Sequence, residues 1–173
     1  MADTRVTPHE ILLPVKPGFI AATLVAALLM NLLPWSGYAL AIKPDFVALV
    51  VLYWCIETPR RVGFLAAWLL GLLMDVADGT LFGQHALAYA FLAYAAEYFR
   101  RRVLRFPLWQ QAVQVAVLLG LCSALVLVVR FVGGAPLPRW TYAVPPIVGA
   151  LLWPILTTAI QSWQRPQPSK SAL

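Results

Sequence analysis

The sequence predicts an all-α membrane protein built as a bundle of six transmembrane helices. Its 173 residues are 61% hydrophobic and 12% charged, whereas soluble domains are about 45–50% apolar and about 25% charged. The mean hydropathy is +0.77, and the apolar residues gather in six runs separated by short polar stretches. The net charge of +6 does not indicate nucleic-acid binding, because the basic residues lie between apolar runs, where they set membrane topology.

The predicted organisation is one transmembrane domain with short polar ends. Residues 1–17 have a mixed composition and three prolines, so we expect a cytoplasmic N-terminal lead-in. Residues 18–163 form the predicted six-helix domain, and residues 164–173 form a flexible cytoplasmic tail. The stretch Ala39-Leu40-Ala41 resembles a signal-peptidase site, but the long, partly acidic head favours a retained anchor.

The six apolar runs differ in length. The first, residues 18–35, is close to the roughly 20 residues that a helix needs to cross the hydrocarbon core. The second, 46–56, and the third, 62–74, are short, and they could instead form a re-entrant hairpin. Two crossings are favoured, because a hairpin would bury Arg60 and Arg61 at membrane depth. The remaining runs are long enough to cross and cover residues 81–99, 112–132 and 143–163.

The distribution of Lys and Arg predicts the orientation. With six crossings, ten of the 13 basic residues fall on the side that holds both termini. Since positive charge concentrates in the cytoplasm, we expect both termini there. The internal basic residues of that side are Arg60, Arg61, Arg100, Arg101, Arg102 and Arg105; the other side has Lys43, Arg130 and Arg139.

Two aspartates at the end of the third run are the leading candidates for a site on the opposite, outer rim. Asp75 and Asp78 follow an apolar helix, whose C-terminus disfavours carboxylates. Asp78 belongs to an Asp-Gly-Thr turn and could cap the next helix. Asp75 lies one turn deeper, where an ionisable group is a functional-site hypothesis. Lys43 is the nearest cation in this topology, so we predict a Lys43–Asp75 ion pair, with Asp45 as N-cap of the second helix.

Small residues recur at helical spacing on the third and fourth runs. Such ridges let membrane helices approach closely, so we expect these faces to meet protein rather than lipid. The predicted packing residues are Gly63, Ala67 and Gly71 on one helix and Ala86, Ala90 and Ala93 on the next.

The sequence provides no catalytic constellation. It has seven acids and two histidines, without a Ser-His-Asp, phosphate-loop or zinc pattern, so no nucleophile and base can be assigned and no cofactor is expected. His85 is interpreted as a hydrogen-bonding residue. The enzymatic alternative is a magnesium site formed by Asp45, Asp75 and Asp78 that acts on a lipid phosphate. Magnesium enzymes usually also hold the phosphate with Arg or Lys side chains, and only Lys43 is available here.

The run from Lys43 to Tyr94, KPDFVALVVLYWCIETPRRVGFLAAWLLGLLMDVADGTLFGQHALAYAFLAY, carries a family resemblance. A Pro-Asp opening, a Tyr-Trp pair, a helix ending in Gly-Leu-Leu-x-Asp and a Leu-Phe-Gly turn before an Ala-rich helix occur in this order. This run resembles the signature region of MreD, the rod-shape-determining membrane proteins of bacteria. The resemblance points to Pro44, Asp45, Asp75 and Gly83 as the first positions to test.

The resemblance implies a non-enzymatic scaffold of the cell-wall elongation machinery in the bacterial inner membrane. Its expected partners are MreC, by direct contact with an exposed flank, and the glycosyltransferase RodA, penicillin-binding protein 2 and the filament protein MreB within the same complex. It also implies a fold similar to the substrate-binding subunits of energy-coupling-factor transporters. The alternative function is therefore a transporter subunit that binds a small molecule or lipid. The Arg100–Arg105 cluster either contacts anionic lipid headgroups or only fixes topology.

Overall fold

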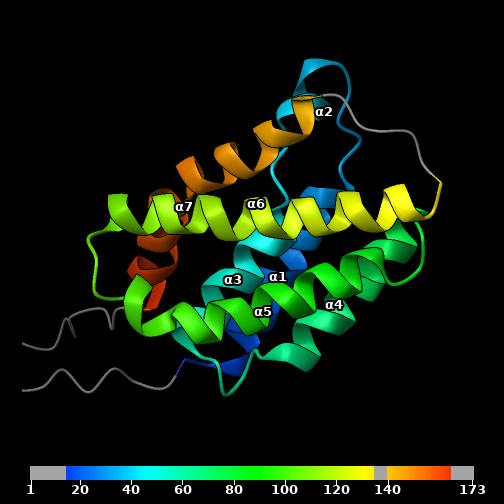
Figure 1. Ribbon diagram of the computed structural model, residues 1–173. Helices are drawn as coiled ribbons and strands as arrows, with labels where there is room; N and C mark the ends of the chain where they lie inside the picture. Colours follow the sequence, from blue (N-terminus) through cyan, green and yellow to red (C-terminus); the bar gives the residue numbers. More distant parts are fainter. Residues whose placement is uncertain (1–14, 135–139, 165–173) are drawn as a thin grey trace, which may run out of the picture.

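The computed structural model describes residues 15–134 and 140–164, and in them all regular secondary structure is helical (Figure 1). Most of the predicted lead-in and nearly all of the predicted tail lie outside the described residues. The elements are α1 (Pro17–Leu32), α2 (Tyr38–Ile42), α3 (Phe46–Glu57), α4 (Phe64–Ala77), α5 (Gln84–Val103), α6 (Leu108–Val132), the 3-10 helix η1 (Trp140–Ala143) and α7 (Val144–Gln164).

Three stretches of the described chain are long and apolar enough to cross a membrane. They are Tyr38–Glu57, which joins α2 to α3, and the helices α6 and α7. Helices α1 and α4 are apolar but shorter. The prediction of an all-helical membrane protein is therefore confirmed in its coarser form, and the six crossings remain a prediction.

Helix α3 is the centre of the bundle. All ten residues from Val47 to Ile56 are buried, as expected for a helix that is apolar on every side. It packs against α1, α5 and α7. Trp54 donates a hydrogen bond to Thr23 of α1 at 2.9 Å, and the ring of Tyr53 lies 6.0 Å from that of Trp153 in α7.

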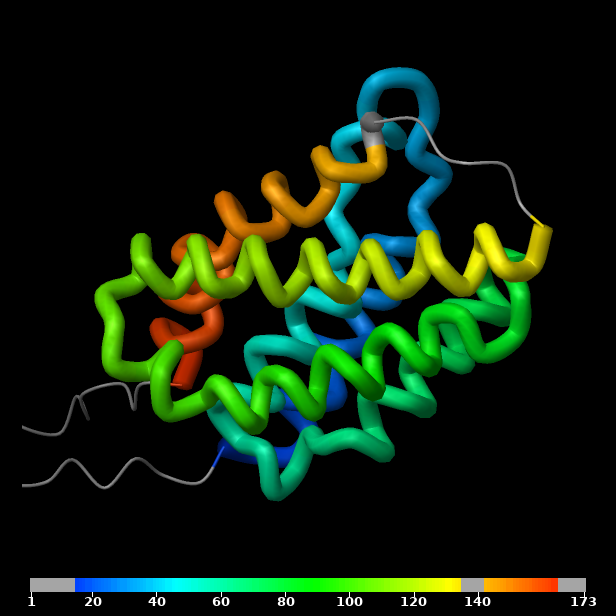
Figure 2. Tube along the Cα trace, viewed as in Figure 1, coloured from blue at the N-terminus to red at the C-terminus, as the bar shows by residue number. Residues whose placement is uncertain are grey.

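The chain reverses direction between α3 and α4, α4 and α5, and α5 and α6 (Figure 2). At one end, which we call the basic end, Arg61 of the α3–α4 loop donates to the carbonyl oxygen of Val15, and Arg100 of α5 donates to that of Ile56 in α3. At the opposite end, which we call the carboxylate end, α1 and α4 finish where α3 and α5 begin, and Asp45 and Asp75 lie there.

The turn between α4 and α5 has the hydrogen bonds of a Schellman motif. Asp78 is the C-cap of α4, and Gly79 after it has a φ of +59°. The amide of Thr80 donates to the carbonyl oxygen of Asp75 at 3.1 Å. Asp78 therefore lies in a turn, as predicted. The expectation that it could cap the next helix is wrong, because α5 begins at Gln84 with Gly83 as its N-cap.

Helices α4 and α5 approach each other through small residues. A Cβ atom added to Gly71 would lie 2.4 Å from the Cα atom of Ala86, so backbone packs on backbone at this point. Ala67, Ala90 and Ala93 are also buried, whereas Gly63 is half-buried at the N-cap of α4. The closeness of the two helices places the end of α4 within reach of the first amides of α5.

Candidate functional site

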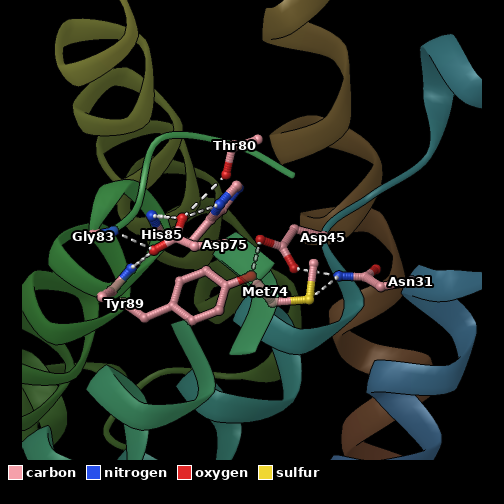
Figure 3. Close-up of polar contacts among 9 residues, drawn as sticks. Asn31, Asp45, Met74, Asp75, Thr80, Gly83, His85 and Tyr89 are labelled. Carbon is pink, nitrogen blue, oxygen red and sulfur yellow. Dashed lines mark hydrogen bonds and ion pairs between the residues drawn. The ribbon is translucent and has the colours of Figure 1, made fainter. Parts of the chain in front are cut away.

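Polar side chains from four helices meet at the carboxylate end (Figure 3). They come from the end of α1, the start of α3, the end of α4, the turn between α4 and α5, and the first two turns of α5. We call this set the polar network, and its members are Asn31, Asp45, Asp75, Thr80, His85 and Tyr89.

Asp75 caps the N-terminus of the neighbouring helix. The residue is 1% exposed, and its side chain accepts hydrogen bonds from the backbone amides of Gly83 and His85 at 2.8 Å and of Ala86 at 3.3 Å. The first amides of a helix have no partner within the helix, and Gly83, as N-cap, has no side chain to offer. The carboxylate of α4 supplies the acceptor that α5 lacks, and the positive end of the α5 dipole stabilises its charge.

Two side chains complete the surroundings of Asp75. Thr80 donates from its hydroxyl at 3.2 Å, and Nδ1 of His85 lies 2.9 Å from Oδ1. The predicted hydrogen-bonding role of His85 agrees with this geometry. Figure 3 shows Asp75 enclosed by the turn that connects α4 to α5.

The predicted Lys43–Asp75 ion pair is wrong. The ammonium of Lys43 donates instead to the carbonyl oxygen of Asn31 at 2.6 Å, which lies in the last turn of α1. The free amides of α5 compensate the charge of Asp75, so no cation from α2 is needed. The lysine stabilises the C-terminal end of α1, where cations are favourable.

Asp45 forms the second centre of the network. Its Oδ1 accepts from the amide of Ala48 at 3.0 Å, which confirms its predicted role as N-cap of α3. The same oxygen accepts from the side-chain amide of Asn31 at 3.0 Å, and Oδ2 accepts from the hydroxyl of Tyr89 at 2.5 Å. Asn31 in turn accepts from the amide of Phe46 at 3.1 Å. The start of α3 is therefore tied to both α1 and α5.

A cavity of about 150 Å³ lies beside the network. Asp45 and His85 form its polar wall, and residues of α6 and of the start of α7, including Leu119, Val126 and Pro146, form its apolar wall. Pro44 is buried near Gly149 of α7, outside the cavity lining.

A larger apolar groove of about 560 Å³ lies along the outer side of α4 and α5. Ala90 and Gly83 line it together with exposed aromatic and aliphatic side chains. The latter are Phe64, Trp68, Leu87, Phe91 and Tyr94.

The predicted arginines all lie toward the basic end, away from the network. Arg100 is half-buried against α3, and its Nε satisfies a carbonyl oxygen in the last turn of that helix. The others, Arg60, Arg61, Arg101, Arg102 and Arg105, are exposed.

The sequence reasoning missed Asn31, Tyr89 and the contact of Arg100 with α3. A lone Asn inside an apolar run is a usable signal, because an amide in a membrane segment is costly unless it has partners. The role of Tyr89 was harder to predict, since a tyrosine in an Ala-rich helix is also common in protein cores.

The geometry is that of a structural network. Between them, the two carboxylates accept from at least four backbone amides as well as from side chains. Among the described residues, no group of three or more His, Cys, Asp or Glu side chains could hold a metal ion. The alternative magnesium site of Asp45, Asp75 and Asp78 is therefore not formed.

Comparison with known proteins gives a consistent result. The family model described as rod shape-determining protein MreD matches residues 15–162. A rod shape-determining protein MreD of Haemophilus influenzae is 31% identical over 137 residues, which cover 78% of this chain and 83% of the relative. No solved structure matches, so the likeness to energy-coupling-factor subunits remains an expectation. The family match over most of the chain and the similarity to this relative show that the chain belongs to the MreD family.

Proposed function

We propose that this chain is a non-enzymatic membrane scaffold of the rod complex, which supports peptidoglycan synthesis and cell-shape control in the bacterial inner membrane. The family name and the name of the relative both refer to determination of rod shape. Within that role, the chain binds MreC directly and supports RodA and penicillin-binding protein 2, with MreB in the same complex.

The observation that carries the proposal is the apolar groove on α4 and α5. Exposed aromatic rings border it, and its floor is formed in part by Ala90. Small residues on a helix surface let a second helix approach closely in a membrane, while rings at the sides add contact area at low entropic cost. A transmembrane helix of MreC fits this combination.

The position of α4 supports docking on this side. Gly71 and Asp75 hold its inner face tightly against α5. Its opposite face carries Leu65, Leu69 and Val76, which are all exposed. A partner that binds here therefore meets a preformed surface, and little ordering cost offsets the contacts it gains.

The proposed orientation places both termini in the cytoplasm. Five exposed arginines gather at the basic end, whereas the carboxylate end has Lys43 and Arg130 among the described residues. Basic residues in short loops between membrane helices favour the cytoplasmic side. The polar network and its cavity then lie at the outer face of the inner membrane, and the six predicted segments cross in alternating directions.

The proposal is tested by removing the aromatic sides of the groove. We expect the double variant Trp68→Ala, Phe91→Ala to reduce co-purification of MreC by at least about tenfold, because each buried aromatic side chain at a binding hot spot contributes about 2 kcal/mol. The variant should also fail to restore rod shape in cells that lack the wild-type protein.

The matched control is Val113→Ala, Val117→Ala, on the exposed surface of α6. It removes apolar side chains outside the groove and should leave MreC binding unchanged. The docking proposal is wrong if the groove variant is folded in the membrane and binds MreC as well as this control does.

A further inference from the structure

The cavity beside the polar network has the size of a small binding site. Its volume is about 150 Å³, and a cavity of this size holds about six heavy atoms, as benzene does in an engineered protein cavity. Unlike a purely apolar void, it has Asp45 and His85 on one side and the hydroxyls of Ser123 and Tyr142 on others. A ligand here can bury an apolar part and form hydrogen bonds as well.

The charges of the residues that line the cavity favour a cationic ligand group. None of the described residues that line the cavity is a lysine or an arginine, whereas Asp45 is a carboxylate. Its Oδ2 atom accepts one hydrogen bond in the described chain, from Tyr89, and a carboxylate oxygen has room for a second donor. A protonated amine fits this acceptor, while a phosphate at the same place would be repelled.

A cation lies just beyond the cavity. Arg130, at the end of α6, donates to the hydroxyl of Tyr142 at 3.0 Å, and its guanidinium carbon is 5.9 Å from the centre of that ring. Tyr142 lines the cavity together with Asp45 and also contacts Arg130. A molecule with an amine at one end and an anionic group at the other would meet an opposite charge at both ends.

We propose that this cavity binds the protonated primary amine of a small zwitterionic molecule, with the amine at Asp45 and the anionic group toward Arg130. An aminoethyl group attached to a phosphate has this chemistry, either as the headgroup of phosphatidylethanolamine or as free phosphoethanolamine. The site goes beyond the scaffold function and does not depend on it, because the cavity and the groove share no lining residue.

The test measures the thermal stability of the delipidated full chain in detergent. Phosphatidylethanolamine should raise the Tm in a saturable way. Its N-acetylated form, which lacks the amine charge, and phosphatidylglycerol with the same acyl chains should not. Phosphoethanolamine without acyl chains should give the shift as well if the free molecule is a ligand. If the acyl chains are required, only the lipid gives it.

Three variants locate the effect. Val126→Trp fills the cavity from α6 and should abolish the shift, whereas Val128→Trp, on an exposed face of the same helix, should preserve it. Asp45→Asn keeps an oxygen that can cap α3 but loses the negative charge, and it should weaken amine binding about tenfold or more.

The outcomes separate clearly. A shift that requires the free amine and disappears in Val126→Trp supports the site. Equal shifts with phosphatidylethanolamine and phosphatidylglycerol, or no shift with either amine source, overturn it. These ligand comparisons use the unmodified chain, so they decide the proposal even where a variant does not fold. MreC co-purification remains a separate measurement, and failure here leaves the scaffold function standing.

Discussion

The carboxylate of Asp75 lies 2.8 Å from the backbone nitrogen of His85, so one helix provides the N-cap of the next. In most helices the capping side chain belongs to the residue that precedes the first turn. Here Gly83 occupies that position, and the acceptor comes from eight residues earlier in the chain. The contact fixes the relative position of α4 and α5, and both helices border the groove that we propose for partner binding.

Removing this cap should destabilise the helix pair strongly. We expect Asp75→Ala to lower the free energy of unfolding by about 3 kcal/mol, because it leaves several buried amides without an acceptor. Asp75→Asn keeps one acceptor oxygen and should cost about 1–2 kcal/mol. Thermal or denaturant unfolding in detergent measures both values, and membrane insertion should be normal.

Asp78 provides the matched control for these variants. It is exposed and lies one turn further along, so Asp78→Asn should change stability by less than about 0.5 kcal/mol. Equal stability of Asp75→Ala and the wild-type chain would contradict the capping role. Normal MreC binding and normal cell shape with a destabilised Asp75→Asn would make the residue structural rather than functional.

The close approach of α4 and α5 should not tolerate a side chain at Gly71. A Cβ atom there would lie 2.4 Å from Cα of Ala86, so Gly71→Ala must separate the two backbones and should cost about 1–3 kcal/mol. Gly71→Leu should cost more. The Tm in detergent gives the comparison.

Gly120 is the control for helix propensity. It lies within α6, where an added Cβ atom would meet nothing within 4 Å. Gly120→Ala should therefore be neutral or stabilise by up to about 1 kcal/mol. If Gly71→Ala behaved in the same way, a direct backbone contact between α4 and α5 at Gly71 would be contradicted.

The sequence predicted the helices well because the apolar runs mark them directly. The run 46–56 became α3 at Phe46–Glu57, and the run ending at residue 132 became α6, which also ends at Val132. Asp45 was predictable as a cap because an N-cap bonds to amides only two or three residues ahead. Local pattern contained all the information in these cases.

The partner of Asp75 was not predictable in the same way. Charge counting selected Lys43, since it was the nearest cation in the expected topology, but the real partners are uncharged amides of another helix. The availability of these amides depends on how closely α4 and α5 pack. Gly71 permits the close approach, but the sequence does not identify the helix that Gly71 contacts. A helix start without a Ser, Thr, Asp or Asn cap is the signal that such an acceptor must come from elsewhere.

The hydrogen bond between Tyr89 and Asp45 should be measurable as a stability term. Tyr89→Phe removes a donor at 2.5 Å from a carboxylate and leaves the ring in place, so we expect a loss of about 1.5–3 kcal/mol. Tyr94→Phe, at an exposed position of the same helix, should have no measurable effect on unfolding. An equal effect of the two changes would show that the buried hydroxyl contributes nothing to the network.

Cysteine labelling should distinguish the two ends of the bundle. Tyr38 is 95% exposed at the carboxylate end, and Arg101 is exposed at the basic end. In intact cells, a membrane-impermeant maleimide should label Tyr38→Cys and not Arg101→Cys, and permeabilised cells should show both. The native Cys55 and Cys122 are buried, so the wild-type chain should give little background. Labelling of only Arg101→Cys in intact cells would place the polar network in the cytoplasm, and the arginines of the basic end would then oppose the charge rule that motivates the orientation.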